Sequence, residues 1–123
     1  MRSFPGTSAL LLLACALPRD PAPPTDTPVG VRSHNGSDVD VYLFCGDHDA
    51  RWLGMVPEHG GAGYSISAEE RRCAVGLNFF LVVRKQGRGY WVGPFRPQPD
   101  SYVDLLIEKY AGLSSARLSW ATH

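Results

Sequence analysis

Apolar and polar residues alternate strictly over residues 38–45, in the segment Asp-Val-Asp-Val-Tyr-Leu-Phe-Cys. Val39, Val41, Leu43 and Cys45 occupy every second position, and the residues between them change from charged to aromatic. A period of two is typical of a β-strand with one face in the core and one face nearer to solvent. A helical repeat of 3.6 residues would not separate these positions, so we predict a strand here.

Short segments of the same kind recur along the chain between turn signals. The predicted strands are residues 29–34, 38–45, 51–56, 64–67, 73–84, 90–95, 101–109 and 116–120. Asn35-Gly36 predicts a tight hairpin between the first two strands. Residues 57–63 form a glycine-rich loop, and Ser67-Ala68-Glu69-Glu70 matches a capping box with room for one turn of helix. We therefore expect a loop or a 3₁₀ corner after residue 67.

Residues 73–84 are the longest predicted strand. One face is lined by Leu77, Phe79, Leu81 and Val83, and the other face also carries apolar residues, which indicates a central strand. Pro94 places the next strand at a sheet edge. Seven or eight short strands at regular spacing predict an all-β fold, a single antiparallel β-sandwich over residues 29–121, with a β-barrel as the alternative.

Residues 1–16 have the pattern of a secretory signal peptide. Arg2 is followed by an apolar run at residues 9–14, which is too short to cross a membrane, and small residues follow the run. Leu12-Leu13-Ala14-Cys15 resembles a bacterial lipobox, in which the cysteine is lipidated and becomes the mature N-terminus. Ala14-Cys15-Ala16 also fits the small-x-small rule of ordinary signal peptidase sites, so both cleavage patterns stay open.

Residues 17–28 contain five prolines in twelve positions. Such a segment forms neither a helix nor a sheet ladder, and it is extended and semi-rigid. We interpret it as a tether between the signal region and the folded domain.

Three cysteines leave an odd thiol in an exported protein. Lipidation of Cys15, or its removal with the signal peptide, leaves Cys45 and Cys73 as a pair. An up-and-down path would bring both cysteines to the same end of the sandwich, and we predict a disulfide between them. The alternative is two buried free thiols that behave as small hydrophobes.

Residues 31–35, 38–42 and 51–56 together resemble small bacterial envelope lipoproteins that contain one immunoglobulin- or transthyretin-like sandwich. The resemblance covers most of residues 29–120. It implies a fold and a location in the cell envelope, and it implies no enzymatic activity.

Aromatic residues provide the candidate binding surface, which comprises Trp52, Tyr90, Trp91 and Phe95. Aromatic side chains on an exposed sheet face stack on sugars or anchor a protein partner. The alternative is that these side chains fill the core, as aromatic residues of small sandwiches often do. Tyr42 and Phe44 lie opposite the Val39 face of their strand, where they would form an exposed patch or be covered by another segment.

Few features of the sequence indicate catalysis, cofactor binding or metal binding. The chain has no Gly-x-Ser-x-Gly motif, Walker loop, His-Glu-x-x-His motif or dinucleotide fingerprint, and no cofactor is implied. His34 and His59 are weak candidates for a metal or acid–base site, and Asp47-His48-Asp49 fits an ordinary polar turn. A formal net charge of zero with scattered arginines gives no reason to expect nucleic acid binding.

These observations predict a non-enzymatic protein of the bacterial cell envelope, attached to the membrane through a lipid on Cys15, that presents a surface to an envelope protein or glycan. The first alternative is a periplasmic or secreted module that binds carbohydrate or peptide. The second alternative is a metal protein or an enzyme that uses the two histidines.

Overall fold

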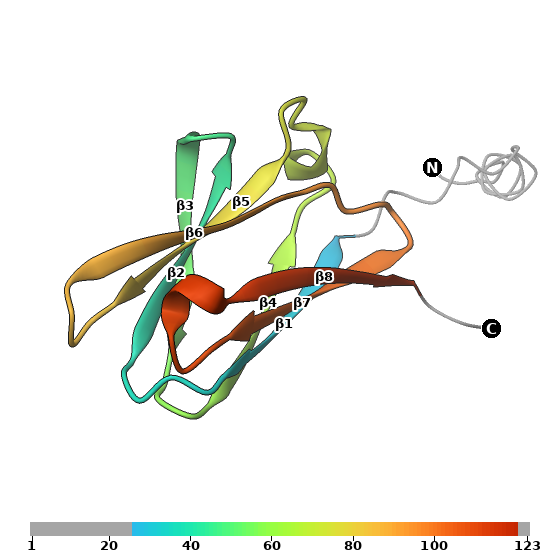
Figure 1. The fold of residues 1–123 in the computed structure, drawn as a ribbon. Helices are drawn as coiled ribbons and strands as arrows, with labels where there is room; N and C mark the ends of the chain where they lie inside the picture. Colours follow the sequence, from blue (N-terminus) through green and yellow to red (C-terminus); the bar gives the residue numbers. More distant parts are fainter. Residues whose placement is uncertain (1–25, 121–123) are drawn as a thin grey trace, which may run out of the picture.

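The computed structural model describes residues 26–120, which form a sandwich of two four-stranded sheets (Figure 1). One sheet has the order β4 (Gly61–Ile66), β1 (Thr27–Ser33), β7 (Ser101–Ile107), β8 (Ser115–Trp120). The other has the order β3 (His48–Val56), β2 (Val39–Cys45), β5 (Leu77–Val83), β6 (Arg88–Phe95). Two 3₁₀ turns, η1 (Glu70–Arg72) and η2 (Ala111–Leu113), lie in the connections. The all-β sandwich predicted from the sequence is confirmed.

The core lies between the two sheets and is built from alternate residues of each strand. Both β2 and β5 bury every second side chain, as their alternation predicts. The largest fully buried side chains are Phe79, Leu43, Ile66, Leu81, Leu105, Ile107, Val29, Val39, Val41, Val56, Val83 and Val103. Burial of apolar side chains stabilises a fold by about 25 cal/mol per Å² of area removed from water, so this cluster is the main source of stability.

The strand order corrects one expectation. Asn35-Gly36 does not form a hairpin, because β1 pairs with β4 and, in parallel, with β7, whereas β2 belongs to the other sheet. Asn35 is buried, and its Nδ2 donates to the carbonyl oxygens of Glu108 and Lys109, 3.1 Å away in both cases. Its Oδ1 accepts a 3.0 Å hydrogen bond from the Ser37 amide. The Asn-Gly pair therefore ties the crossing between the sheets to the end of β7.

Several strand bounds also differ from those predicted. β1 begins at Thr27, two residues before the expected domain start, because proline is tolerated in the first residues of a strand. β4 begins at Gly61, since its glycines pair with β1 instead of forming a loop. The longest strand is β3, which includes His48 and Asp49, and β5 is shorter than expected. The central place of β5 and the edge place of β6 are confirmed.

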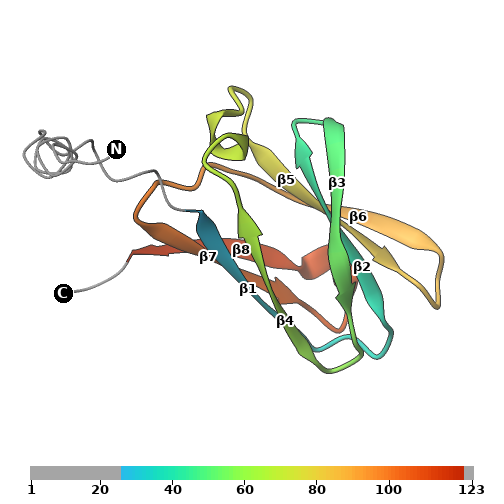
Figure 2. The same cartoon turned by 180° about the vertical axis from the view of Figure 1, so that it is seen from behind.

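The connections fall at two ends of the sandwich, here called the η1 end and the η2 end. The η1 end holds the start of β1, the β2–β3 hairpin, η1 and the β6–β7 connection, as Figure 2 shows from behind. The predicted capping box is confirmed there, because the Glu70 amide donates to Ser67 Oγ at 3.0 Å and the Ser67 amide donates to Glu70 Oε1 at 2.9 Å. The η2 end holds the connections that follow β1, β3, β5 and β7, of which the first two cross between the sheets.

Candidate binding surface

A row of four aromatic side chains crosses the outer face of the β3-β2-β5-β6 sheet, one from each strand. The register pairs Trp52 with Tyr42, Tyr42 with Phe80, and Phe80 with Trp91. Tyr42 and Phe80 alternate with buried neighbours on their strands, so their side chains face away from the core. Trp52 and Trp91 are paired with these two residues and are exposed, so they lie on the same outer face. We call Trp52, Tyr42, Phe80 and Trp91 the aromatic row.

The rings of the row are in close contact at the β5–β6 side. The ring centroids of Phe80 and Trp91 are 4.6 Å apart, and Phe44 meets Trp91 edge to face at 4.8 Å and 70°. Phe80 also lies over Gly89, because a Cβ built there would lie 2.0 Å from Phe80 Cζ. A glycine therefore leaves the space that the Phe80 ring fills.

The β3 side of the row is held by a charged group. Trp52 Nε1 donates a 3.1 Å hydrogen bond to Asp40 Oδ1. The Arg84 guanidinium binds both carboxylate oxygens of Asp40, at 2.8 and 2.9 Å. The hydrogen bonds from Arg84, with that from Trp52, outweigh the effect of burial and hold the pKa of Asp40 below its ordinary value. The indole is thus positioned by a carboxylate that stays ionised.

The structure divides the four predicted surface residues into two pairs. Trp52 and Trp91 are 55% and 52% exposed. Tyr90 is half-buried and packs against the core, and Phe95 is 8% exposed and stacks on Phe79 at 4.7 Å. The prediction is therefore wrong for Phe95. A register shift inserts one extra residue of β6 opposite β5 and turns Phe95 to the inner face.

Two members of the row were not among the predicted surface residues. The sequence leaves open whether Tyr42 is exposed or covered, and it places Phe80 among the apolar residues on the second face of a predicted central strand. The signal that could have found them was the alternation itself, since both residues fall between buried positions. The cross-strand register that unites them is not visible in a sequence.

The candidate metal ligands do not assemble into a site. His34 and His59 both lie at the η2 end, where His34 Nδ1 is 3.9 Å from Glu108 Oε1 and the His59 amide donates to the Asn35 carbonyl. Within residues 26–120, no group of three or more His, Cys, Asp or Glu side chains is placed to hold a metal ion.

The predicted disulfide is present. Cys45 and Cys73 are bonded, with Cα atoms 5.7 Å apart, and the bond joins the end of β2 to the segment after η1. The lipidation candidate Cys15 lies outside the described residues. Among the described helices, none is long and apolar enough to cross a membrane.

Comparisons with known proteins do not identify a family for this chain. No protein-family model matches the sequence, and a search of curated proteins found no match. One similar solved structure is the NMR structure of a protein from Eubacterium rectale, which is 12% identical to this chain with a TM-score of 0.47. The match covers 78% of this chain and 90% of that chain.

Proposed function

We propose that this chain is an exported, non-enzymatic β-sandwich protein of the bacterial cell envelope that binds a protein partner through the aromatic row. The observation that supports this most directly is a four-strand-wide band of aromatic side chains on a sheet face that no described segment covers. Tryptophan and tyrosine dominate the binding energy of protein interfaces, and a polar rim commonly surrounds them. Here the Asp40–Arg84 pair lies at the rim.

Ring geometry favours a protein over a glycan as the partner. Phe44 meets Phe80 and Trp91 at interplanar angles of 74° and 70°, and Phe80 is tilted by 52° against Trp91. A sugar ring stacks on a flat aromatic face, whereas this cluster presents ring edges beside ring faces. A corrugated apolar surface of this kind complements the side chains of another protein.

The location is part of the same proposal. The signal-like residues 1–16 and the proline-rich residues 17–28 support export, and the Leu-Leu-Ala-Cys segment supports a lipid anchor on Cys15. The sandwich with two four-stranded sheets is compatible with the immunoglobulin- or transthyretin-like class that the resemblance implies. A periplasmic or secreted form is the alternative if cleavage follows Ala16.

Site-specific photo-crosslinking in living bacteria tests the partner. A photoreactive amino acid at position 91 should give a discrete protein adduct, and the same probe at Tyr102 should not, because Tyr102 is exposed on the outer face of the other sheet. Gly89→Ala should remove the adduct by displacing Phe80, while Gly30→Ala should keep it, since a Cβ there meets only an ordinary contact at 3.7 Å.

Two outcomes would contradict the proposal. The absence of an adduct at position 91, together with glycan binding that Trp91→Ala abolishes, would make the protein a carbohydrate-binding module. Equal adducts at positions 91 and 102 would show that the aromatic row has no special role. Intact mass of the membrane-extracted chain, compared with a Cys15→Ser variant, tests the anchor separately.

A further inference from the structure

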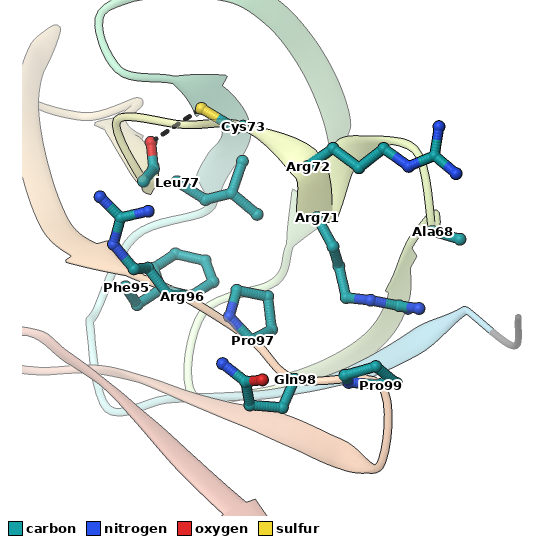
Figure 3. Close-up of a pocket in the computed structure, with 11 residues that line it drawn as sticks. Ala68, Arg71, Arg72, Cys73, Leu77, Phe95, Arg96, Pro97, Gln98 and Pro99 are labelled. Atoms are coloured by element: carbon teal, nitrogen blue, oxygen red, sulfur yellow. Dashed lines mark hydrogen bonds between the residues drawn. The ribbon is translucent and has the colours of Figure 1, made fainter.

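A hollow of about 410 Å³ opens at the η1 end of the sandwich, and no residue of the aromatic row lines it. Figure 3 shows its lining residues. One wall is formed by η1 and the segment that leads into β5. The other wall is formed by the end of β6 and the connection to β7. Its lining includes Arg71, Arg72, Arg96, Leu77, Phe95 and Pro97. This volume is within the range of small-molecule sites in proteins.

Both walls are fixed by bonds within the fold. The Cys45–Cys73 disulfide joins the first wall to β2, and Arg51 binds both carboxylate oxygens of Glu70 in η1 at 2.7 and 2.8 Å. In the second wall, Ser101 Oγ lies 2.8 Å from both the amide nitrogen and the carbonyl oxygen of Gln98. The hollow is therefore a preformed feature of the sandwich.

Three arginines surround the hollow, and its lining within the described residues contains no Asp or Glu. Arg71 is positioned by a 3.0 Å hydrogen bond from its Nη1 to Thr27 Oγ1. In the part of the chain that the structure describes, the side chains of Arg72 and Arg96 make no hydrogen bond or ion pair. In Figure 3, Arg71 and Arg96 lie on opposite sides of Pro97.

A second hollow adjoins the first and shares Arg72, Cys73 and Leu77 with it. That hollow is lined by Asp49, Glu69 and Glu70, and Arg72 borders both hollows. Burial would raise the pKa of Glu70, but the hydrogen bonds from Arg51 and Ser67 lower it overall, so Glu70 stays ionised and paired with Arg51. The η1 corner thus separates an acidic side from a basic side.

We propose that the basic hollow binds a phosphate group attached to a small apolar body. A guanidinium binds phosphate through paired, charge-assisted hydrogen bonds. A phosphate accepts such bonds from several sides, which suits arginines on opposite walls better than a flat carboxylate would. Leu77, Phe95 and Pro97 form the buried apolar floor of the hollow, and Ala68 and Pro99 keep apolar surface accessible to the attached group.

The phosphate has two sources, a soluble phosphate ester or a phospholipid headgroup. The hollow lies at the end of the sandwich where β1 begins, so it would face the membrane if Cys15 carries a lipid. That point alone rests on the proposed anchor. The site itself stands on its own geometry.

The test uses the full-length chain with Cys15→Ser, so that no lipid anchor contributes to vesicle binding. Phenyl phosphate should shift the NMR signals of the Gly76 and Gln98 amides and should bind more tightly than inorganic phosphate. Arg72→Gln combined with Arg96→Gln should weaken phenyl phosphate binding by about a hundredfold, because two charge-assisted contacts are lost, each worth roughly a factor of ten. An unchanged melting temperature would show that this double variant folds.

The matched control is Arg32→Gln combined with Arg117→Gln, which removes the same charge from exposed positions on β1 and β8 that do not line the hollow. It should change affinity less than twofold. Preference for phosphatidylglycerol over phosphatidylcholine vesicles, lost with the Arg72 and Arg96 changes, identifies a lipid source, and phenyl phosphate binding without this preference identifies a soluble one. No shift at the hollow with phenyl phosphate and no vesicle preference would overturn the proposal, as would equal weakening by the control.

Discussion

Removal of the Cys45–Cys73 bond should cost a large share of the stability of this domain. The two cysteines are 28 residues apart in the sequence. A disulfide that closes a loop of this length lowers the conformational entropy of the unfolded chain, which stabilises the folded state by about 3.6 kcal/mol. This stabilisation is lost when the bond is removed. Small domains are stable by only about 5 to 15 kcal/mol, so the loss should be easy to measure.

The assay is urea unfolding of the chain with Cys45→Ala and Cys73→Ala together, followed by tryptophan fluorescence. The expected loss in the free energy of unfolding is about 3 to 4 kcal/mol. Most of it comes from the unclosed loop, and a smaller part comes from the contacts that Cys45 and Cys73 make with the core. Cys15→Ser serves as the control, because it removes a thiol without opening the loop. Its unfolding free energy should match that of the parent.

The structure also predicts where the loss is felt. The bond fixes the corner around η1 to β2, whereas Val41 and Leu81 pair with each other inside the two central strands, β2 and β5. Amide exchange should therefore accelerate most around Cys73 and Gly76 in the double variant. A total loss below about 1 kcal/mol, or free thiols at Cys45 and Cys73 in the purified protein, would refute the reasoning behind this estimate.

Three further predictions concern single groups. Tyr64→Phe should raise the unfolding free energy by about 1 kcal/mol, because the buried Tyr64 hydroxyl has no hydrogen-bond partner among the described residues. Burial raises the pKa of Tyr64, so the parent should lose stability as the pH rises above 10, and Tyr64→Phe should lose less in pH-dependent melting. Asn35→Ala should cost about 3 kcal/mol in urea unfolding, since it removes three hydrogen bonds to backbone groups. Asp40 has a pKa lowered below 3.8 by Arg84, so its contribution is present above that pH and is lost in more acid solution. NMR titration of an Arg84→Gln variant should show the Asp40 pKa shifted upward.

Local alternation predicted the strands and the core well, because the pattern of burial within one strand depends only on that strand. Val39, Val41 and Leu43 are buried as expected, and so are Leu77, Phe79, Leu81 and Val83. The capping box at Ser67 and Glu70 was equally readable, since both partners of each hydrogen bond are three residues apart. Features of this kind depend only on residues that are close together in the sequence, so they can be predicted from it.

Pairing between strands was less predictable, because it depends on contacts between distant segments. Asn35-Gly36 has the composition of a hairpin turn, but the Asn35 side chain binds carbonyl groups that lie more than seventy residues later. The parallel pairing of β1 with β7 has no local signature either. The cysteine pairing was nevertheless predicted correctly from the end of the fold at which each cysteine lies, although the expected up-and-down path was wrong.

The candidate surface was half predictable for a related reason. Trp91 and Phe95 lie four residues apart, and uninterrupted alternation would place both on the same face. One extra residue in β6 breaks the alternation, so Phe95 enters the core and Trp91 stays outside. A composition-based set of aromatic residues could not separate these two positions. The true row became visible only with the register of all four strands.

The fold also limits how a partner would approach if the chain is anchored through Cys15. β1 begins at the η1 end, where the chain emerges from residues 1–25, and the strands run between that end and the η2 end. The strands would then run roughly perpendicular to the membrane, and the aromatic row would face parallel to the membrane surface. A protein that binds the row would then lie beside the domain. Crosslinks from position 91 should accordingly reach neighbouring envelope proteins, and deletions within residues 17–25, which precede β1, should reduce their yield without changing the stability of the sandwich.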